Sequence, residues 1–578
     1  MKNFLPIFLI CALLMPAQAK QNKIQDPVLN TLEQELKREF KQLKKAKPPV
    51  YFLSYQITER DNFYLGATLG TINFEKTLNE AYLDVDVRVG SPELDNTRKI
   101  KLMDMDRLSN NSNKNPFLIK VSLTDDKALK NSIWLTTDLA AKAAQEQYLK
   151  VLNNSKTAAA RNDNSADFSK APKKPAKYIA DMPEVKINIP ELKKEMENLS
   201  ALMKGYNFIY ASSVDFYLVK ETNYFVNSEG TKIKEPRVLI RLNYQINSRN
   251  KDGMQLSRTN SYDGITMQDL PSVEQIKQDI LKSIDELKQL QNAPSADTFH
   301  GPVILKNRAA GVFFHEILGH RVEGHRQKDD DFGQTFTQKV GEQIVAPIIT
   351  VYDDPTLTHF KNIPLRGHYL YDDEGTPAQK TMMIENGILK GFLMGRSPIK
   401  NFPDSNGHGR KSYGRKVVSR MGVTVVEAKN QISYDELVQK LKQEIKRQNK
   451  PYGLIIDDIS GGFTNTDTYS PQSFKVQPLL VYKVFPDGRP NELVRGADIV
   501  GTPLTSFNKI IAAANDDALF NGTCGAESGW VPVSAIAPSL LISELEVEKV
   551  NKTYENLPIL PPPSAETKTE SQTKKEVK

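Results

Sequence analysis

Apolar residues recur every three or four positions in five segments of the chain, which is the spacing of a helix that buries one face. Ser272 with Gln275, and Ser433 with Glu436, stand at the starts of two of these segments in the order of a capping box. We therefore predict five helices outside the histidine-rich segment described below. They cover residues 29–43, 137–152, 190–204, 272–291 and 434–447.

Segments rich in β-branched and aromatic residues, separated by turn residues, lie between these helices. Residues 50–90 show this pattern and predict a meander of strands, and residues 206–230 and 236–249 predict antiparallel strands. From about residue 300 the strand pattern dominates, interrupted by the helix at 434–447 and by the segment FFHEILGH. Helical and strand patterns thus mix along the whole chain.

Composition divides the chain further. A chain of 578 residues is too long for one core, so roughly two to four structural units are expected. Residues 153–177 have almost no large apolar side chains, which favours flexibility, and the C-terminus is Pro-rich and then polar. The predicted divisions are a signal peptide (1–19), a first part of the N-terminal domain (20–152), a flexible linker or insertion (153–186), a middle α+β region (187–298), a C-terminal β-rich domain (299–552) and a disordered tail (553–578).

The first nineteen residues, MKNFLPIFLICALLMPAQA, have the order of a secretory signal peptide: a lysine, an apolar run and a small-residue cleavage site. The run is short for a membrane span and polar residues follow it. We expect an exported protein, periplasmic or secreted, with a mature N-terminus at Lys20 and no membrane span in the mature chain. An uncleaved N-terminal anchor is the alternative.

Charge and cysteine content narrow the choice of partners. The net charge is +7, and loss of Lys2 with the signal leaves +6; basic residues are scattered among acidic ones, which gives no support to nucleic-acid binding. Cleavage would also remove Cys11 and leave Cys524 as the one cysteine, so no internal disulfide is expected. The lone thiol should be either buried and inert or bound to something.

The stretch FFHEILGHRVEGHR, residues 313–326, is the strongest candidate site. It holds three of the seven histidines, His315, His320 and His325, with Glu316 and Glu323 between them. Imidazole and carboxylate groups suit a divalent zinc ion, and a carboxylate next to a ligand can act as general base. Residues five apart on an ideal helix are rotated by about 140°, so His315 and His320 need a distortion to meet.

Two distortions would bring His315 and His320 together. A local π bulge would move both toward one face, or Gly319 could let the helix loosen or stop before His320. A chance cluster of core or surface histidines is the remaining interpretation.

The segment and its surroundings resemble the TldD/PmbA family of metallopeptidases. The HExxxH helix stands here as residues 315–320 and is followed by the acidic-glycine pair Glu323-Gly324. Further matches keep the family's order between about 220 and 548. They are YFVNSEG (224–230), YDDEGTPAQKTMMIENGILKGFLMGR (371–396), NGHGRKSYG (406–414), SRM (419–421), ISGGFTNT (459–466), LVRGADIVGTPL (493–504) and GTCGAESGWVPVSAIAPSLLI (522–542).

The resemblance implies an α+β fold, with an N-terminal sheet-and-helix domain and a C-terminal, mainly antiparallel β domain that carries the metal-site helix. It implies a zinc-dependent peptidase that hydrolyses small or unfolded peptides by metal-activated water. His315, His320 and Cys524 would be the metal ligands, and Glu316 the general base. It also implies a dimer, either a homodimer or a heterodimer with a family paralogue.

Several residues remain open on the sequence alone. His325 stands where the family usually has Asp, so it is either exposed or, like Glu323, an alternative ligand. Asp373 and Glu374 form either a charged turn or a substrate contact. Gly461 and Gly462 form either a bulge or a place where a substrate strand lies against the backbone. The alternative functions are a non-catalytic partner subunit and a binding or scaffold protein with a structural zinc site.

Overall fold

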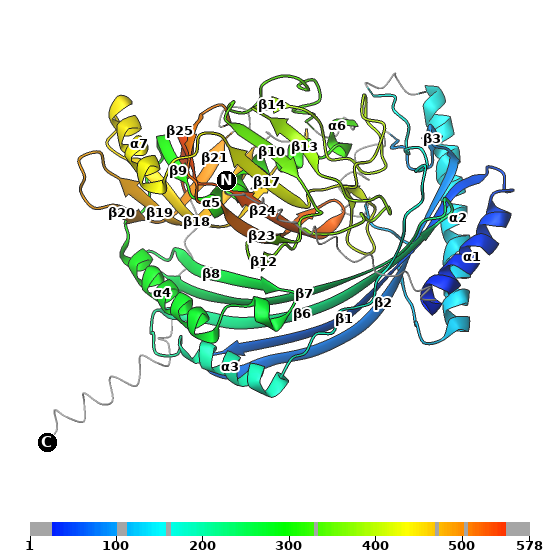
Figure 1. The fold of residues 1–578 in the computed structure, drawn as a ribbon, viewed down its shortest axis with the longest axis horizontal. Helices are drawn as coiled ribbons and strands as arrows, with labels where there is room; N and C mark the ends of the chain where they lie inside the picture. Colours follow the sequence, from blue (N-terminus) through cyan, green and yellow to red (C-terminus); the bar gives the residue numbers. More distant parts are fainter. Residues whose placement is uncertain are drawn as a thin grey trace, which may run out of the picture.

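A computed structural model describes residues 26–100, 113–157, 163–328, 333–468, 473–501 and 507–550. The predicted signal peptide and the predicted tail lie outside these residues. The fold is α+β, as expected, and consists of a large curved sheet beneath a compact β-rich domain (Figure 1).

The N-terminal half forms one sheet that combines strands from residues 20–152 and from residues 187–298, and its long strands are antiparallel. Its central strands are ordered β2-β1-β6-β7. The region 50–90, predicted to be a meander of strands, consists mainly of two long strands, β1 and β2. Residues 52–66 of β1 pair continuously with β2, and the sheet curves beneath the C-terminal domain. The strands are β1 (Val50–Thr68), β2 (Thr71–Ser91), β3 (Leu94–Asp95), β4 (Ile119–Lys120), β5 (Lys177–Ile179), β6 (Ile209–Asn227), β7 (Lys232–Arg249) and β8 (Gln255–Gly264).

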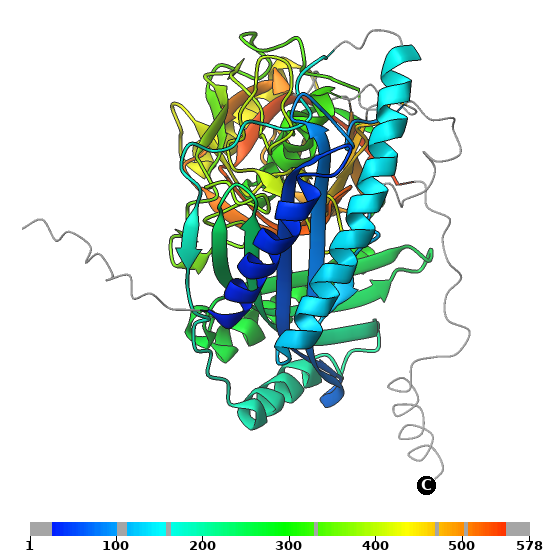
Figure 2. The same ribbon diagram turned by 90° about the vertical axis from the view of Figure 1, so that its right-hand side faces the viewer.

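Four helices pack on this sheet in two pairs. α1 (Pro27–Leu43) and α2 (Asp126–Thr157) contact each other and cover one end, whereas α3 (Ile189–Ala201) and α4 (Val273–Asn292) cover the other (Figure 2). Ser272 caps α4 by accepting from the Gln275 amide. Each pair closes its own apolar core, so the long sheet is stabilised at both ends.

The stretch predicted to be a flexible linker, 153–186, is largely built into the fold, so that expectation was wrong for the residues described. α2 continues to Thr157, and β5 pairs in parallel with β7. Phe168 is 3% exposed and packs edge-on against Phe52. The Arg396 guanidinium lies 3.9 Å from the Phe168 ring centroid. Asp167 accepts from the Asp95 amide, and Arg396 donates to Ser169 Oγ, so this stretch is bound to both halves of the molecule.

The C-terminal half contains two larger sheets and two short hairpins. In the six-stranded sheet the order is β14-β13-β10-β17-β24-β23; in the other, β18-β9-β25-β21-β19, the pairing of β18 with β19 closes a ring. Most pairs are antiparallel; β17–β24 and β18–β9 are parallel. The strands are β9 (Phe299–Leu305), β10 (Ile349–Asp353), β11 (His359–Phe360), β12 (Ile363–Pro364), β13 (Thr381–Glu385), β14 (Ile388–Leu389), β15 (Gly409–Arg410), β16 (Val418–Ser419), β17 (Val423–Ala428), β18 (Gly453–Thr464), β19 (Phe474–Val484), β20 (Glu492–Val494), β21 (Ala497–Gly501), β22 (Ile510–Ala513), β23 (Ala518–Ala526), β24 (Gly529–Ala537) and β25 (Leu540–Lys549).

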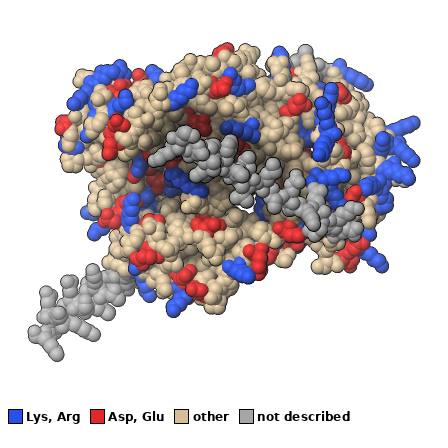
Figure 3. Space-filling view, viewed as in Figure 1, with Lys and Arg blue, Asp and Glu red and all other residues tan. Residues whose placement is uncertain are grey.

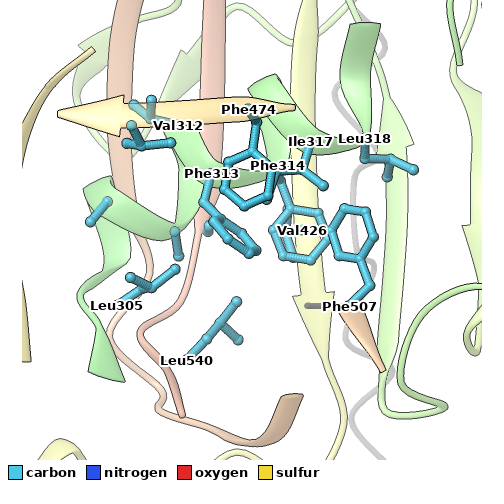
Figure 4. Close-up of a cluster of buried hydrophobic side chains, with 14 of the residues drawn as sticks. Leu305, Val312, Phe313, Phe314, Ile317, Leu318, Val426, Phe474, Phe507 and Leu540 are labelled. Carbon is cyan, nitrogen blue, oxygen red and sulfur yellow. The ribbon is translucent and has the colours of Figure 1, made fainter. Parts of the chain in front are cut away.

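Helix α5 (Asn307–Ile317) is enclosed between these two sheets. It contacts β18 and β19 of one sheet and β17, β23 and β24 of the other. Phe313 and Phe314 pack with Phe474 and Phe507 (Figure 4). Truncating a buried aromatic residue of this kind costs about 3–5 kcal/mol. The helix that carries the histidines is therefore fixed from both sides.

The remaining helices are short or lie at the surface. α7 (Tyr434–Arg447) begins at Ser433, where the predicted capping box with Glu436 is present, and packs on the ring of strands. Two 3₁₀ turns, η1 (Met267–Asp269) and η2 (Gly319–Val322), and α6 (His325–Lys328) complete the elements. No helix in the described part of the chain is long and apolar enough to cross a membrane.

Candidate metal centre

The helix stops between the two histidines of the HExxxH segment. α5 ends at Ile317, and the 3₁₀ turn η2 begins at Gly319. The His315 and His320 rings consequently lie with their centroids 5.0 Å apart and nearly perpendicular. A Cβ at position 319 would lie 2.0 Å from the Met421 sulfur. Of the two predicted distortions, the break at Gly319 is therefore the correct one, and it leaves no room for a larger residue.

Cys524, which lies on β23, joins the two histidines. Its Sγ is 3.1 Å from His315 Nε2 and 3.3 Å from His320 Nε2. All three side chains are buried, and one potential ligand atom from each lies within 4.8 Å of the others. The structure thus brings together the three residues named as metal ligands, although more than two hundred positions separate Cys524 from the helix.

The electrostatics favour a thiolate at this position. Burial alone would raise the pKa of Cys524, but His320, His315 and Arg420 together lower it well below the usual value. Burial would likewise lower the pKa of His320, yet Cys524 and Glu323 raise it to about 10. The thiolate is the form of cysteine that binds metal ions, and a metal ion bound here would take the place of the proton that His320 holds in its absence.

Glu323 supports the site but is not one of the three clustered ligands. Its Oε1 lies 3.2 Å from His320 Nδ1, and its Oε2 accepts a 2.8 Å bond from Arg326 Nε. Burial would raise the pKa of Glu323, but the charges of His320 and Arg326 lower it to about 2. A carboxylate on the far nitrogen of a histidine fixes the ring and its tautomer, which leaves Nε2 facing Cys524.

Arg420 contacts both Glu323 and the backbone of Cys524. It was not predicted as a site residue from the sequence. Its side chain is fully buried; Nη2 donates 2.8 Å to the Cys524 carbonyl, and Nη1 donates 2.9 Å to Ser528 Oγ. Its Nε also lies 3.4 Å from Glu323 Oε1. The SRM element that contains Arg420 was the signal available, but an arginine in a short motif does not reveal which backbone it will hold.

Glu316 follows His315 directly and lies against the glycine pair of β18. A Cβ added to Gly462 would meet Glu316 Cγ at 2.4 Å, whereas nothing lies within 4 Å of a Cβ at Gly461. Burial raises the pKa of Glu316. Gly462 therefore provides the space that this carboxylate occupies, and Gly461 faces open space.

These residues line a cavity of about 890 Å³ between the two halves of the molecule. Its C-terminal wall includes His315, Glu316, His320 and Cys524, together with residues 459–467 and 520–527. The N-terminal sheet contributes Tyr217, Arg241, Asn243, Thr259, Asn260 and Ser261. Figure 3 shows the hollow between the upper and lower parts of the molecule, with charged side chains inside it.

Three other candidate residues take different places. His325 is not at the surface: its side chain is 13% exposed, and Nε2 lies 3.9 Å from Glu527 Oε2, outside the three-residue cluster. Asp373 and Glu374 line a second cavity instead of the one with the cluster. Asp373 accepts from the Lys411 amide, and Glu374 accepts from the Arg396 amide. Gln56 of the N-terminal sheet also donates a 3.4 Å hydrogen bond to Asp373 Oδ1, so both carboxylates are bound by other segments of the protein.

Comparison with known proteins agrees with this arrangement. Residues 298–549 match the family described as PmbA/TldA metallopeptidase C-terminal domain. A metalloprotease TldD homolog from Haemophilus influenzae is 32% identical over 257 residues, which are 43% of this chain and 48% of that protein. A zinc metalloprotease TldD homolog from Saccharolobus solfataricus is 25% identical over 282 residues, 48% of this chain and 58% of that protein.

The first of these matches spans about half of its relative's own length. The fold as a whole is similar to the crystal structure of TldE from Thermococcus kodakarensis, with a TM-score of 0.58 and 16% identity, over 90% of this chain and 100% of that one. The matched domain contains the histidine helix, the glycine pair and Cys524. Over residues 298–549, the chain therefore carries a domain of the kind described as the PmbA/TldA metallopeptidase C-terminal domain.

Proposed function

We propose that this protein is a zinc-dependent peptidase acting on small or unfolded peptides. The observation that carries the proposal is the meeting of His315, His320 and Cys524 in a cavity beside Glu316. In a tetrahedral zinc site with the usual Zn–N and Zn–S lengths, a nitrogen and a sulfur ligand lie about 3.5 Å apart. The separations here, 3.1 and 3.3 Å, are close to that value, so the residues fit the ion.

The proposed chemistry divides between the ion and the protein. When bound, zinc supplies an acidified water and a Lewis acid. Glu316 accepts a proton from the attacking water and can return it to the leaving amine; burial, which raises its pKa, makes it a stronger base than a solvated carboxylate. Glu323 and Arg420 hold His320 and the Cys524 backbone in place. Three protein ligands leave a coordination position for water, as a hydrolytic site requires.

The open edge of β18 offers a way to bind a peptide backbone. β9 pairs with β18 at residues 454–456, and β19 pairs along the opposite edge as far as Thr464. Beyond Ile459, the β9 side of β18 therefore has no strand partner within the described ranges, and residues 460–464 line the cavity. An extended peptide added there would be bound through its main chain. Such binding depends little on side chains and suits unfolded substrates.

Assembly and location belong to the same proposal. We expect a homodimer or a heterodimer with a family paralogue, a partnership suggested by the likeness to TldE. We also expect export through the N-terminal segment, which the order of charged, apolar and small residues supports. N-terminal sequencing that found Met1 on cytosolic protein would contradict the second expectation.

The decisive experiment is the substitution Glu316→Gln in the purified protein. It should keep the zinc content, because no ligand is altered, and it should lower peptide turnover by about 10² or more if proton transfer is lost. Metal analysis and hydrolysis of an unfolded peptide, with and without chelator, measure both. Full chelator-sensitive activity in the variant would refute the role of Glu316. Stoichiometric zinc without activity in the unaltered chain would favour a structural zinc site or a non-catalytic partner subunit.

A further inference from the structure

Among the described residues, one cation in the cavity wall has no carboxylate partner. Of the arginines that line the cavity, Arg241 pairs with Asp263, and Arg326 pairs with Glu323 and Glu527. Arg308 has no ion pair or side-chain hydrogen bond among the described residues, and its Nε is shielded from solvent without a hydrogen-bond partner. An unpaired guanidinium in a partly enclosed site is ready to bind an anion.

Arg308 lies on the same face of α5 as the general base. Arg308, Val312 and Glu316 are spaced four residues apart, and all three line the cavity. Such spacing places them in one row along a helix. Seven residues separate Arg308 from His315, which corresponds to about 10 Å along the helix axis. Arg308 therefore lies at one end of the cavity wall formed by α5, and the metal site lies farther along the same wall.

The neighbouring strand β18 runs along the cavity wall in the same direction as α5. Gly462 of β18 lies against Glu316, and Thr466, just beyond the end of β18, accepts a 2.8 Å bond from Arg326. Ile459, three residues before Gly462, also lines the cavity and is about 10 Å from it along the strand, on the side away from Thr466. The Lys306 amide donates a 3.0 Å hydrogen bond to the Ile456 carbonyl, so α5 begins beside the part of β18 that lies away from Thr466. Arg308, two residues after Lys306, is therefore on the side of the metal site opposite Arg326.

We propose that Arg308 binds a carboxylate of the substrate, about three residues from the bond that is cut. An extended peptide advances about 3.3 Å per residue, so 10 Å corresponds to about three residues. Either the C-terminal carboxylate of a peptide or an Asp or Glu side chain can supply the group. This inference rests on the proposed peptidase function and adds to it a binding site that selects and positions the substrate.

The test uses full-length, zinc-loaded protein carrying Glu316→Gln, so that binding is measured without turnover. The probes are a fluorescent ten-residue peptide of uncharged residues with a free C-terminal carboxylate, its C-terminal amide, and amidated versions with one Glu at successive positions. Fluorescence anisotropy at fixed ionic strength gives Kd for each. Arg308→Met removes the charge, Arg308→Lys keeps it, and Arg489→Gln, an exposed arginine outside the cavity wall, is the matched control.

We expect the free acid, or one of the Glu peptides, to bind at least ten-fold more tightly than the uncharged amide. Arg308→Met should abolish that difference, Arg308→Lys should retain part of it, and Arg489→Gln should leave it unchanged. A preference for the free acid identifies the C-terminal carboxylate, and a preference for one Glu position identifies a side chain. Equal binding of all peptides, or a preference that survives Arg308→Met, would overturn the proposal.

Hydrolysis by protein that retains Glu316 separates this proposal from the proposed function. Mass spectrometry of the products should place the cut about three residues from the preferred carboxylate, and Arg308→Met should act mainly on KM. Arg308-dependent binding without hydrolysis would leave the anion site standing and remove the peptidase. Hydrolysis of acid, amide and Glu peptides at equal kcat/KM would do the reverse.

Discussion

The substitution Gly462→Ala on β18 should displace the proposed general base, Glu316, and leave the metal ligands unchanged. In Gly462→Ala the new Cβ would lie 2.4 Å from Glu316 Cγ and 2.9 Å from its Oε1. Carbon atoms in contact normally lie about 3.5–4.0 Å apart, so the Glu316 side chain must retreat by about 1 Å or more. A misplacement of that size can cost about 10² in rate. We therefore expect kcat to fall by about 10².

The neighbouring glycine provides the control. Gly461→Ala meets no atom within 4 Å, and neither glycine has the left-handed backbone that would exclude alanine. Replacing a strand glycine by alanine favours folding by about 0.5–1 kcal/mol where space allows, so Gly461→Ala should be as stable as the parent. It leaves Glu316 and the main-chain groups of β18 unchanged, so its kcat should fall far less than that of Gly462→Ala. Peptide hydrolysis, metal analysis and thermal unfolding of both variants make the comparison. Wild-type turnover in Gly462→Ala, or an equal loss in Gly461→Ala, would refute the reasoning.

Two further predictions concern the ligands and the charges behind them. Cys524→Ser should lose zinc, because a neutral hydroxyl is a much poorer ligand than a thiolate, while His325→Ala should retain it; metal analysis showing the opposite pattern would make His325 the third ligand. Burial would raise the pKa of Glu527, but Arg326 and His325 lower it well below its usual value. Ionised Glu527 should therefore stabilise the folded protein at pH values above the pKa of an unfolded glutamate, about 4.3. Glu527→Gln should cost about 1–3 kcal/mol at pH 7, and denaturant unfolding should show the two proteins converging as the pH falls below 4; an unchanging difference would contradict this assignment.

The helices were readable from the sequence because each buries one face on a sheet. α1, α3, α4 and α7 follow the predicted segments closely, but α2 begins at Asp126 instead of residue 137. The two long strands were read as a meander because the first part of β2 is exposed on both faces. Where neither face is buried, alternation of apolar and polar residues disappears, and only the pairing with β1 reveals a continuous strand.

The candidate site shows a similar division. A local pattern led to His315, Glu316 and His320, and Gly319 indicated how the helix could break. Cys524 came from the family resemblance, since no local pattern connects β23 with α5. The long-range partners of Glu323, and the lack of a partner for Arg308 among the described residues, depend on how segments far apart in the chain are placed. Asp373 and Glu374 have the residue types of a binding site, but they accept hydrogen bonds from the Gln56 side chain and from the Lys411 and Arg396 amides, outside the cavity with the metal-ligand cluster.

The cavity draws its two walls from different parts of the chain, and this separates catalysis from access. The candidate ligands, the base and the glycine pair all lie within residues 298–549, the stretch that matches the family. The opposite wall, with Tyr217, Arg241 and Asn243, belongs to the N-terminal sheet outside it. Substitutions on that sheet can alter what reaches the site while leaving the metal ligands untouched. Proteins that share this metal centre can therefore differ in substrate specificity through changes in the N-terminal sheet, which contributes none of the candidate ligands.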